Sequence, residues 1–217
     1  VERVVERYRG KIHAYEIWNE PNWTFWKGRD EDFFALSRAA AAKIKEIDPA
    51  ARVVAGSFLR APADFIRGMF ESGAVEKVDA VSFHPYAVNP RGAVGLFDKL
   101  KKLLGEYGFS GEIWVTEVGY PSTVGCGEAP WRQDPEAAYS ECYQARAFQA
   151  ASDAIGWQPW LAGSLVWHWD PHPPHPSARI RAYSPQYKLG QDVLAEIWAG
   201  LPGAGEDESL FGFERGA

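Results

Sequence analysis

The sequence predicts an α/β fold in which parallel strands alternate with helices. Two observations lead to this prediction: short apolar runs alternate with helical segments along the whole chain, and polar residues gather where the apolar runs end. Strict alternation favours parallel strands joined by right-handed crossovers, with helices covering the sheet. Because the chemistry of such folds lies at the carboxyl ends of the strands, these polar residues are the candidates for a functional site.

The first half of the chain contains three predicted strands. Asp30 is suited to cap a long alanine-rich helix that ends before "DP", and a proline in the first turn and Gly73 bound the next helix. The run "VDAVSF" is β-branched and apolar, as expected of a buried strand. The predicted elements are a helix at 1–9, a strand at 13–18, a helix at 30–47, a strand at 52–56, a helix at 62–72 and a strand at 78–83.

The second half repeats the same rhythm. It predicts a helix at 93–107, a strand at 112–117, a helix at 135–155, a strand at 163–169 and a helix at 184–200. Residues 1–200 are expected to form one domain, because a domain of this kind spans about 100 to 200 residues. Residues 201–217 are expected to form a loosely packed tail.

The number of strands indicates an incomplete barrel. Five strands are predicted, whereas a closed (β/α)₈ barrel has eight strands and about 250 residues. The chain begins with a helix, so the three further units would precede Val1. An open arc leaves two strand edges and its interior uncovered, which favours association. We therefore expect a homo-oligomer or a separate chain that completes the barrel.

Charge and hydropathy exclude two classes of partner. The 23 basic and 29 acidic residues give a formal net charge of −6, which is the wrong sign for a protein that binds a polyanion such as nucleic acid. The sequence contains no apolar run that approaches the roughly 18 residues of a membrane span. We expect neither nucleic acid nor a membrane as a partner.

Two glutamates follow predicted strands. In "AYEIWNEPNW", Pro21 has no N–H and biases Glu20 toward an extended conformation, so the strand is expected to end at Asn19 and Glu20 with the carboxylate at its rim. Glu117 ends the strand "EIWVTE" and is followed by Gly119, where backbone can pass close to a ligand. Alone, either is more simply read as a solvated or salt-bridged carboxylate. As a pair on one sheet they can flank a glycosidic bond.

Tryptophans and histidines provide weaker signals. Trp23, Trp26 and Trp167 lie at loops or strand ends, where flat amphipathic rings can stack on sugars, although large rings can equally fill a core. The segment "WHWDPHPPHP" contains potential metal ligands, but its prolines prevent the helical spacing that presents paired histidines. We expect this loop to shape a cleft, with no metal and no cofactor. Ser57 has no evident triad partner, which argues against a serine hydrolase.

Four motifs resemble one enzyme clan. "YEIWNEPN", "VSFHPYA", "VTEVGYPS" and "SLVWHWD" are similar to strands four, six, seven and eight of clan A glycoside hydrolases, which are (β/α)₈ barrels. The first two motifs are most similar to families 39 and 5, and the third also resembles family 17. The resemblance implies a partial TIM barrel made of the units of strands 4 to 8, with Glu20 as the acid/base and Glu117 as the nucleophile.

The same resemblance implies a set of substrate contacts. Asn19 would contact the sugar 2-hydroxyl, His84 and Tyr86 would bind substrate and hydrogen-bond the nucleophile, and Trp167 would lie under the sugar ring. The implied activity is hydrolysis of β-glycosidic bonds with retention, of the β-xylosidase, β-glucosidase or cellulase type, on an oligo- or polysaccharide. The alternative is a non-catalytic half-barrel that binds carbohydrate or acts as a scaffold and needs a partner chain.

Overall fold

The structure, a computed structural model, describes residues 1–87, 90–122, 140–155, 160–169 and 183–200. Within these residues the chain divides into two compact units. The first comprises Val1–Gly119 and Ile155–Trp167, and the second comprises Tyr120–Ala154 and His168–Ala217. All five strands belong to the first unit. No helix in the described ranges is long and apolar enough to cross a membrane.

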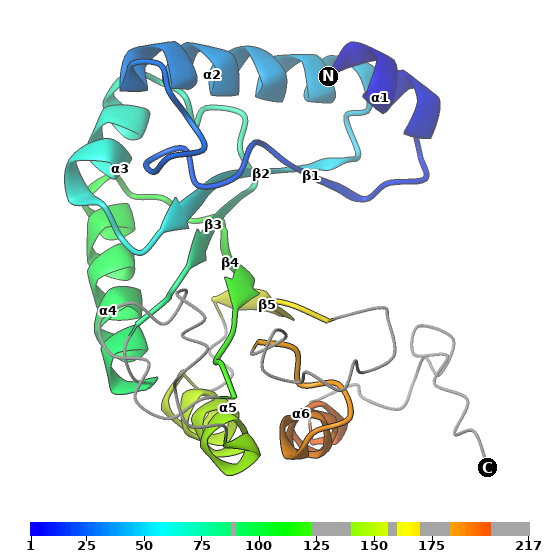
Figure 1. The fold of residues 1–217 in the computed structure, drawn as a ribbon. Helices are drawn as coiled ribbons and strands as arrows, with labels where there is room; N and C mark the ends of the chain where they lie inside the picture. Colours follow the sequence, from blue (N-terminus) through cyan, green and yellow to red (C-terminus); the bar gives the residue numbers. More distant parts are fainter. Residues whose placement is uncertain (88–89, 123–139, 156–159, 170–182, 201–217) are drawn as a thin grey trace. The chain divides into compact units, whose positions relative to one another are not determined.

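The first unit is built on a five-stranded parallel sheet whose strands lie in the order in which they occur in the sequence (Figure 1). The strands are β1 (Ala14–Glu16), β2 (Arg52–Leu59), β3 (Ala80–His84), β4 (Glu112–Val118) and β5 (Leu161–Val166). A parallel sheet in sequence order needs a crossover of the same hand between every pair of strands, which is the arrangement of a (β/α) barrel. The predicted partial barrel of five strands is therefore confirmed.

Four helices accompany this sheet: α1 (Glu2–Tyr8), α2 (Asp30–Ile47), α3 (Ala63–Glu71) and α4 (Pro90–Glu106). Figure 1 shows α2, α3 and α4 along one side of the sheet. Two apolar groups fill the space between helices and strands. Val5, Ile17, Ala40, Ala41, Ile44, Ala51 and Val53 form one cluster. Phe33, Phe34, Phe58 and Phe65 form a set of ring contacts with centroids 5.1–6.4 Å apart. These contacts fix the strand ends that carry the polar residues.

The second unit contains α5 (Glu141–Ile155) and α6 (Leu189–Ala199). Buried Gln144 of α5 holds two segments together, because its side-chain amide donates to the carbonyls of Tyr120 and Tyr183 at 2.8 and 2.9 Å. Lys188 Nζ donates to Ser122 Oγ at 3.0 Å. Burial lowers the Lys188 pKa to about 8. Within the described residues, these hydrogen bonds connect the first turn of α5 and the residues before α6 to residues 120–122, which follow β4.

Most predicted elements match the structure within a few residues, although the ends of β1, β2 and β5 and the start of α6 differ from the prediction. β1 ends at Glu16, four residues before Glu20, and β5 ends at Val166. The prediction that Asn19 and Glu20 end a strand is therefore wrong. The N-terminal part of the predicted helix at 135–155, most of the histidine-rich segment and the tail 201–217 lie outside the described residues.

Candidate active site

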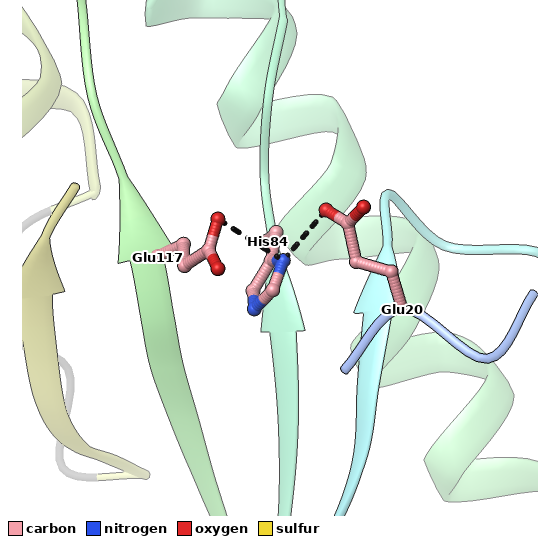
Figure 2. Close-up of side chains that lie close together, drawn as sticks. All are labelled: Glu20, His84 and Glu117. Carbon is pink, nitrogen blue, oxygen red and sulfur yellow. Dashed lines mark hydrogen bonds and ion pairs between the residues drawn. The ribbon is translucent and has the colours of Figure 1, made fainter. Parts of the chain in front are cut away.

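The described polar residues predicted for the site come from β1, β3 and β4 and lie at or just beyond the carboxyl ends of these strands. His84 is the last residue of β3, Glu117 lies near the end of β4, and Glu20 lies in the loop after β1. Figure 2 shows both glutamate side chains pointing toward the imidazole ring of His84. The sheet thus brings together residues that are 64 and 33 positions apart in the chain, as the parallel fold requires.

The backbone of Glu20 adopts an unusual conformation. Its φ is +42°, in the left-handed region that a side chain disfavours, so the predicted extended conformation before Pro21 is wrong. The Glu20 N–H donates to the carbonyl of Ser57 at 3.0 Å, and the Glu20 carbonyl accepts from the N–H of Trp23 at 3.0 Å. Glu20 is only 7% exposed, not at an open rim. Two backbone bonds therefore hold the carboxylate inside the site.

Asn22 fixes this loop to the neighbouring strand. Its side-chain amide donates to the carbonyl of Leu59 at 3.0 Å, and its Oδ1 accepts from the N–H of Leu59 at 2.9 Å. One side chain thus replaces a pair of ladder hydrogen bonds at the end of β2. The sequence analysis did not identify Asn22. An asparagine right after a proline in a non-helical segment was the available signal.

His84 is the centre of the site, and its ring is fully buried. Nδ1 lies 2.8 Å from Glu20 Oε1 and 3.6 Å from Glu117 Oε2. Nε2 lies 3.2 Å from both Ser57 Oγ and Thr116 Oγ1. By distance, the Nδ1 hydrogen bond is made with Glu20 and not with Glu117. The ring therefore connects one glutamate to two hydroxyls on β2 and β4.

Glu117 is half-buried and accepts a hydrogen bond at 3.1 Å from the hydroxyl of Tyr86. Burial raises the pKa of Glu117, and the hydrogen bond from Tyr86 opposes this rise. The pairing register of β4 with β5 is irregular between Val115 and Val118. In a regular strand consecutive side chains point to opposite faces, so this irregularity allows both Thr116 and Glu117 to approach His84.

Ser57 has the histidine neighbour that the sequence did not reveal. With Ser57 on Nε2 and Glu20 on Nδ1, the three residues have the connectivity of a Ser–His–Glu triad. Ser57 is nevertheless 0% exposed, so an external carbonyl cannot reach its hydroxyl. The structure corrects the statement that Ser57 lacks a partner, and burial supplies a better argument against a serine hydrolase.

Among the described residues, one group of potential metal ligands stands out. One ligand atom each of Glu20, His84 and Glu117 lies within 4.8 Å of the others. These atoms already engage one another and Tyr86 by hydrogen bonds, so we interpret the group as a hydrogen-bonded set. Asp170, His172 and His175 of the histidine-rich loop lie outside the described residues.

The predicted aromatic contacts differ in exposure. Trp23 is 53% exposed in the loop after Glu20, and Trp167 is 37% exposed and meets Tyr86 edge-on at 6.5 Å. Trp26 packs edge-on against Trp18, and its indole N–H donates to the carbonyl of Arg29 at 2.9 Å. Asn19, which precedes Glu20, is half-buried. Sugar binding by Asn19, His84, Tyr86, Trp23, Trp26 and Trp167 stays a prediction.

Comparison with known protein families identifies the class. The model of Glycoside Hydrolase Family 113 matches residues 74–186, just over half of the chain, and that of glycosyl hydrolases family 39 matches residues 1–103. The half-barrel is thus that of a clan A glycoside hydrolase. Within the clan, the chain belongs to glycoside hydrolase family 113. Family 39 was among the families expected from the sequence, and family 113 was not.

Solved structures support the fold. A family 113 β-1,4-mannanase superposes with a TM-score of 0.70 at 14% identity over 92% of this chain and 60% of that one. The family 113 β-mannanase from Alicyclobacillus acidocaldarius superposes with a TM-score of 0.67 at 20% identity, over 91% of this chain and 59% of that one. A monomeric β-xylosidase from Caulobacter crescentus superposes with a TM-score of 0.57 at 20% identity, over 79% of this chain and 38% of that one. The chain therefore spans about 60% of the length of the family 113 structures. No protein of curated function matches the sequence.

Proposed function

We propose that this chain carries the catalytic carboxylates of a retaining β-glycosidase, with Glu20 as the acid/base and Glu117 as the nucleophile. The observation that supports this most directly is the distance between them: one oxygen of Glu20 and one of Glu117 lie within 4.8 Å of each other. Carboxyl groups of retaining enzymes are about 5–5.5 Å apart, whereas those of inverting enzymes are about 6.5–9.5 Å apart to admit a water. The spacing therefore favours retention.

The two glutamates have environments that suit different steps. Glu20 is buried and bonded to a ring nitrogen, where it can hold a proton for the leaving oxygen. Glu117 is more exposed and oriented by the Tyr86 hydroxyl, so its free oxygen can attack the anomeric carbon and form a glycosyl-enzyme ester. Glu20, now ionised, then removes a proton from the water that cleaves the ester, and retention results.

The substrate proposed first is a β-1,4-linked mannan. Its support is that the chain belongs to family 113 and that the family 113 structures named above are mannanases. The β-xyloside suggested by the match of residues 1–103 to family 39 is the second substrate to test. β-Glucosidase and cellulase activities, also implied by the sequence motifs, are tested in the same panel.

The experiment measures turnover and labelling together. The chain is assayed on soluble β-1,4-mannan and on aryl β-glycosides that include the mannoside, xyloside and glucoside. An activated 2-fluoro glycoside, which traps the glycosyl-enzyme, is expected to label Glu117 as read by peptide mass spectrometry. Glu117→Gln is expected to lower kcat at least about 10³-fold while the circular dichroism spectrum is unchanged, because the amide is a poor nucleophile of the same shape.

Glu20→Ala is the matched comparison. It is expected to slow substrates with poor leaving groups strongly and activated aryl glycosides much less, because only the poor leaving groups need the proton. Near-normal activity of Glu117→Gln would overturn the nucleophile assignment. Absence of turnover and of labelling, together with quenching of tryptophan fluorescence by sugar, would instead favour the non-catalytic carbohydrate-binding half-barrel.

A further inference from the structure

Which ring nitrogen of His84 carries the hydrogen depends on the contact that Thr116 makes with Nε2, on the side of the ring away from Glu20. The hydroxyl of Thr116 donates to Glu16 Oε1 at 2.8 Å. Glu16 is exposed, and an ionised carboxylate only accepts hydrogen bonds, so the single hydrogen of the Thr116 hydroxyl is used there. Toward His84 Nε2, 3.2 Å away, Thr116 Oγ1 can therefore only accept. The hydrogen of that contact must come from Nε2.

A hydrogen on Nε2 determines whether Nδ1 donates or accepts its hydrogen bond. A neutral imidazole has one N–H, so Nδ1 is then an acceptor. Its partner at 2.8 Å is Glu20 Oε1, which must donate and is therefore protonated. We propose that Glu16 and Thr116 are positioning residues that fix the Nε2–H tautomer of His84, so that the Glu20 carboxyl holds the proton used in catalysis. This inference rests on the acid/base role proposed for Glu20.

Ser57 could stabilise the other tautomer of His84, in which Nδ1 carries the hydrogen and Nε2 accepts. Its hydroxyl also lies 3.2 Å from Nε2 and could donate if Nε2 carried no hydrogen. Two lone pairs, those of Nε2 and Thr116 Oγ1, would then face each other at 3.2 Å, which is unfavourable in a buried site. With Nε2 protonated, both hydroxyl oxygens accept. The Thr116–Glu16 bond thus selects between the two tautomers.

The other titratable groups around His84 are consistent with this assignment. Glu117 lies 3.6 Å from Nδ1, beyond hydrogen-bond distance, and its Oε2 accepts from Tyr86. Glu20 is the ring's direct acidic partner, and Glu16 acts through Thr116. Glu16, Glu20, Tyr86 and Glu117 are the titratable side chains that the hydrogen bonds described above bring into this network.

The contact to Glu16 depends on the curvature of the sheet. Glu16 ends β1 and Thr116 lies in β4, three places away in the strand order and 100 residues away in the chain. A side-chain bond between these strands crosses the concave side of the arc. The sequence alone does not identify this contact, because the position of Glu16 in a strand does not reveal a partner so distant in the chain.

Nitrogen-15 NMR of the histidine-labelled chain tests the tautomer directly. Long-range proton–nitrogen spectra distinguish protonated from bare ring nitrogens, and a His84→Asn variant assigns the signal among the five histidines. We expect Nε2 protonated and Nδ1 bare in the native chain. In Thr116→Val, Ser57 becomes the remaining hydroxyl and can donate, so the ring hydrogen is expected to move to Nδ1. In the control Ser57→Ala, the native tautomer is expected to persist.

A second variant and a kinetic readout complete the test. In Glu16→Gln the new amide can donate to Thr116, which frees the Thr116 hydroxyl to donate to Nε2 without any loss of volume. We expect the same tautomer change there. In both variants, kcat is expected to fall roughly 10-fold or more for poor leaving groups and to change little for activated aryl glycosides. This ratio would not change if the role were purely structural.

The outcomes separate the two proposals. A bare Nε2 in the native chain, a doubly protonated ring, or an unchanged tautomer in both Thr116→Val and Glu16→Gln would overturn the inference. The spectra do not depend on turnover, so the expected tautomers in a chain that fails to hydrolyse any glycoside would leave the hydrogen-bond assignment standing and reject the proposed function.

Discussion

Glu20 combines strain with burial at a single residue. A left-handed φ of +42° at a residue other than glycine costs roughly 1–3 kcal/mol, and it persists because bonds to Ser57 and Trp23 hold the backbone. Trp18 and Ser57, at +69° and +45°, are strained as well. Backbone strain at Glu20 and at residues close to it is typical of a site where position takes precedence over stability.

At the residue scale, Tyr86→Phe tests how the charge on Glu117 is maintained. The Tyr86 hydrogen bond lowers the Glu117 pKa, so its loss should raise that pKa further. Because the nucleophile role proposed for Glu117 requires an ionised carboxylate, activity is expected to be lost as pH falls through this pKa. The acidic limb of the kcat/KM profile should therefore move to higher pH, by roughly half to one unit.

Tyr107→Phe is the matched control for this measurement. It removes an equivalent bond, from the Tyr107 hydroxyl to Glu71 at 2.9 Å, on the exposed surface. The pH profile of this variant should equal that of the native chain. An acidic limb that stays in place in Tyr86→Phe would contradict the proposed role of the bond.

The sequence identified residues by their chemistry and missed those defined by distant contacts. Glu20, His84, Tyr86 and Glu117 stand out because carboxylates and rings follow apolar runs, and the structure brings them together. Thr116 could not be recognised, because its role depends on a partner 100 residues away. Nor could the conformation of Glu20 be predicted, since backbone bonds to another strand overrode the local preference set by Pro21.

At the element scale, β2 contains the irregularity that directs Ser57 to His84. Its register with β3 shifts between Ala55 and Phe58, and Gly56 has φ +115°. The predicted strand at 52–56 ended at this glycine, although pairing continues to Leu59. A glycine inside a strand pattern indicates a bulge as readily as an end, and only the pairing with β3 distinguishes the two.

Gly56→Ala is expected to destabilise the chain by about 2–4 kcal/mol. The added Cβ would lie 2.8 Å from the carbonyl oxygen of Ser82 in a backbone conformation that alanine disfavours. The free energy of unfolding, measured in denaturant, checks this. Gly95→Ala, in open space on α4, should instead stabilise by about 0.5–1 kcal/mol. Equal effects of the two substitutions would refute the argument.

At the scale of the whole molecule, the alternation of apolar runs predicted the parallel arc, because each strand and helix is long enough to show its own period. How the arc is covered could not be predicted in this way. β1 and β5 are the edges of the sheet in the described residues, and each has unpaired backbone groups unless another segment covers them. The expected homo-oligomer or completing chain stays a prediction.

We expect the 217-residue chain to self-associate, because exposed parallel edges pair readily with other strands. Sedimentation velocity over a range of concentrations should detect species larger than one chain. Ala14→Lys on β1 should weaken the association, because a charge on an edge strand opposes pairing, whereas Ala39→Lys on the exposed face of α2 should not. A monomer at every concentration would contradict the expectation.

The bond between Glu16 and Thr116 has a geometric consequence. It is a chord across an arc of four adjacent strands, so it limits how far that arc can flatten. Both glutamates are attached within the same arc, Glu20 through its bond to β2 and Glu117 through β4. The width of the gap between the two glutamates, which would receive the acetal of a substrate, is therefore set by strands β1 to β4 alone.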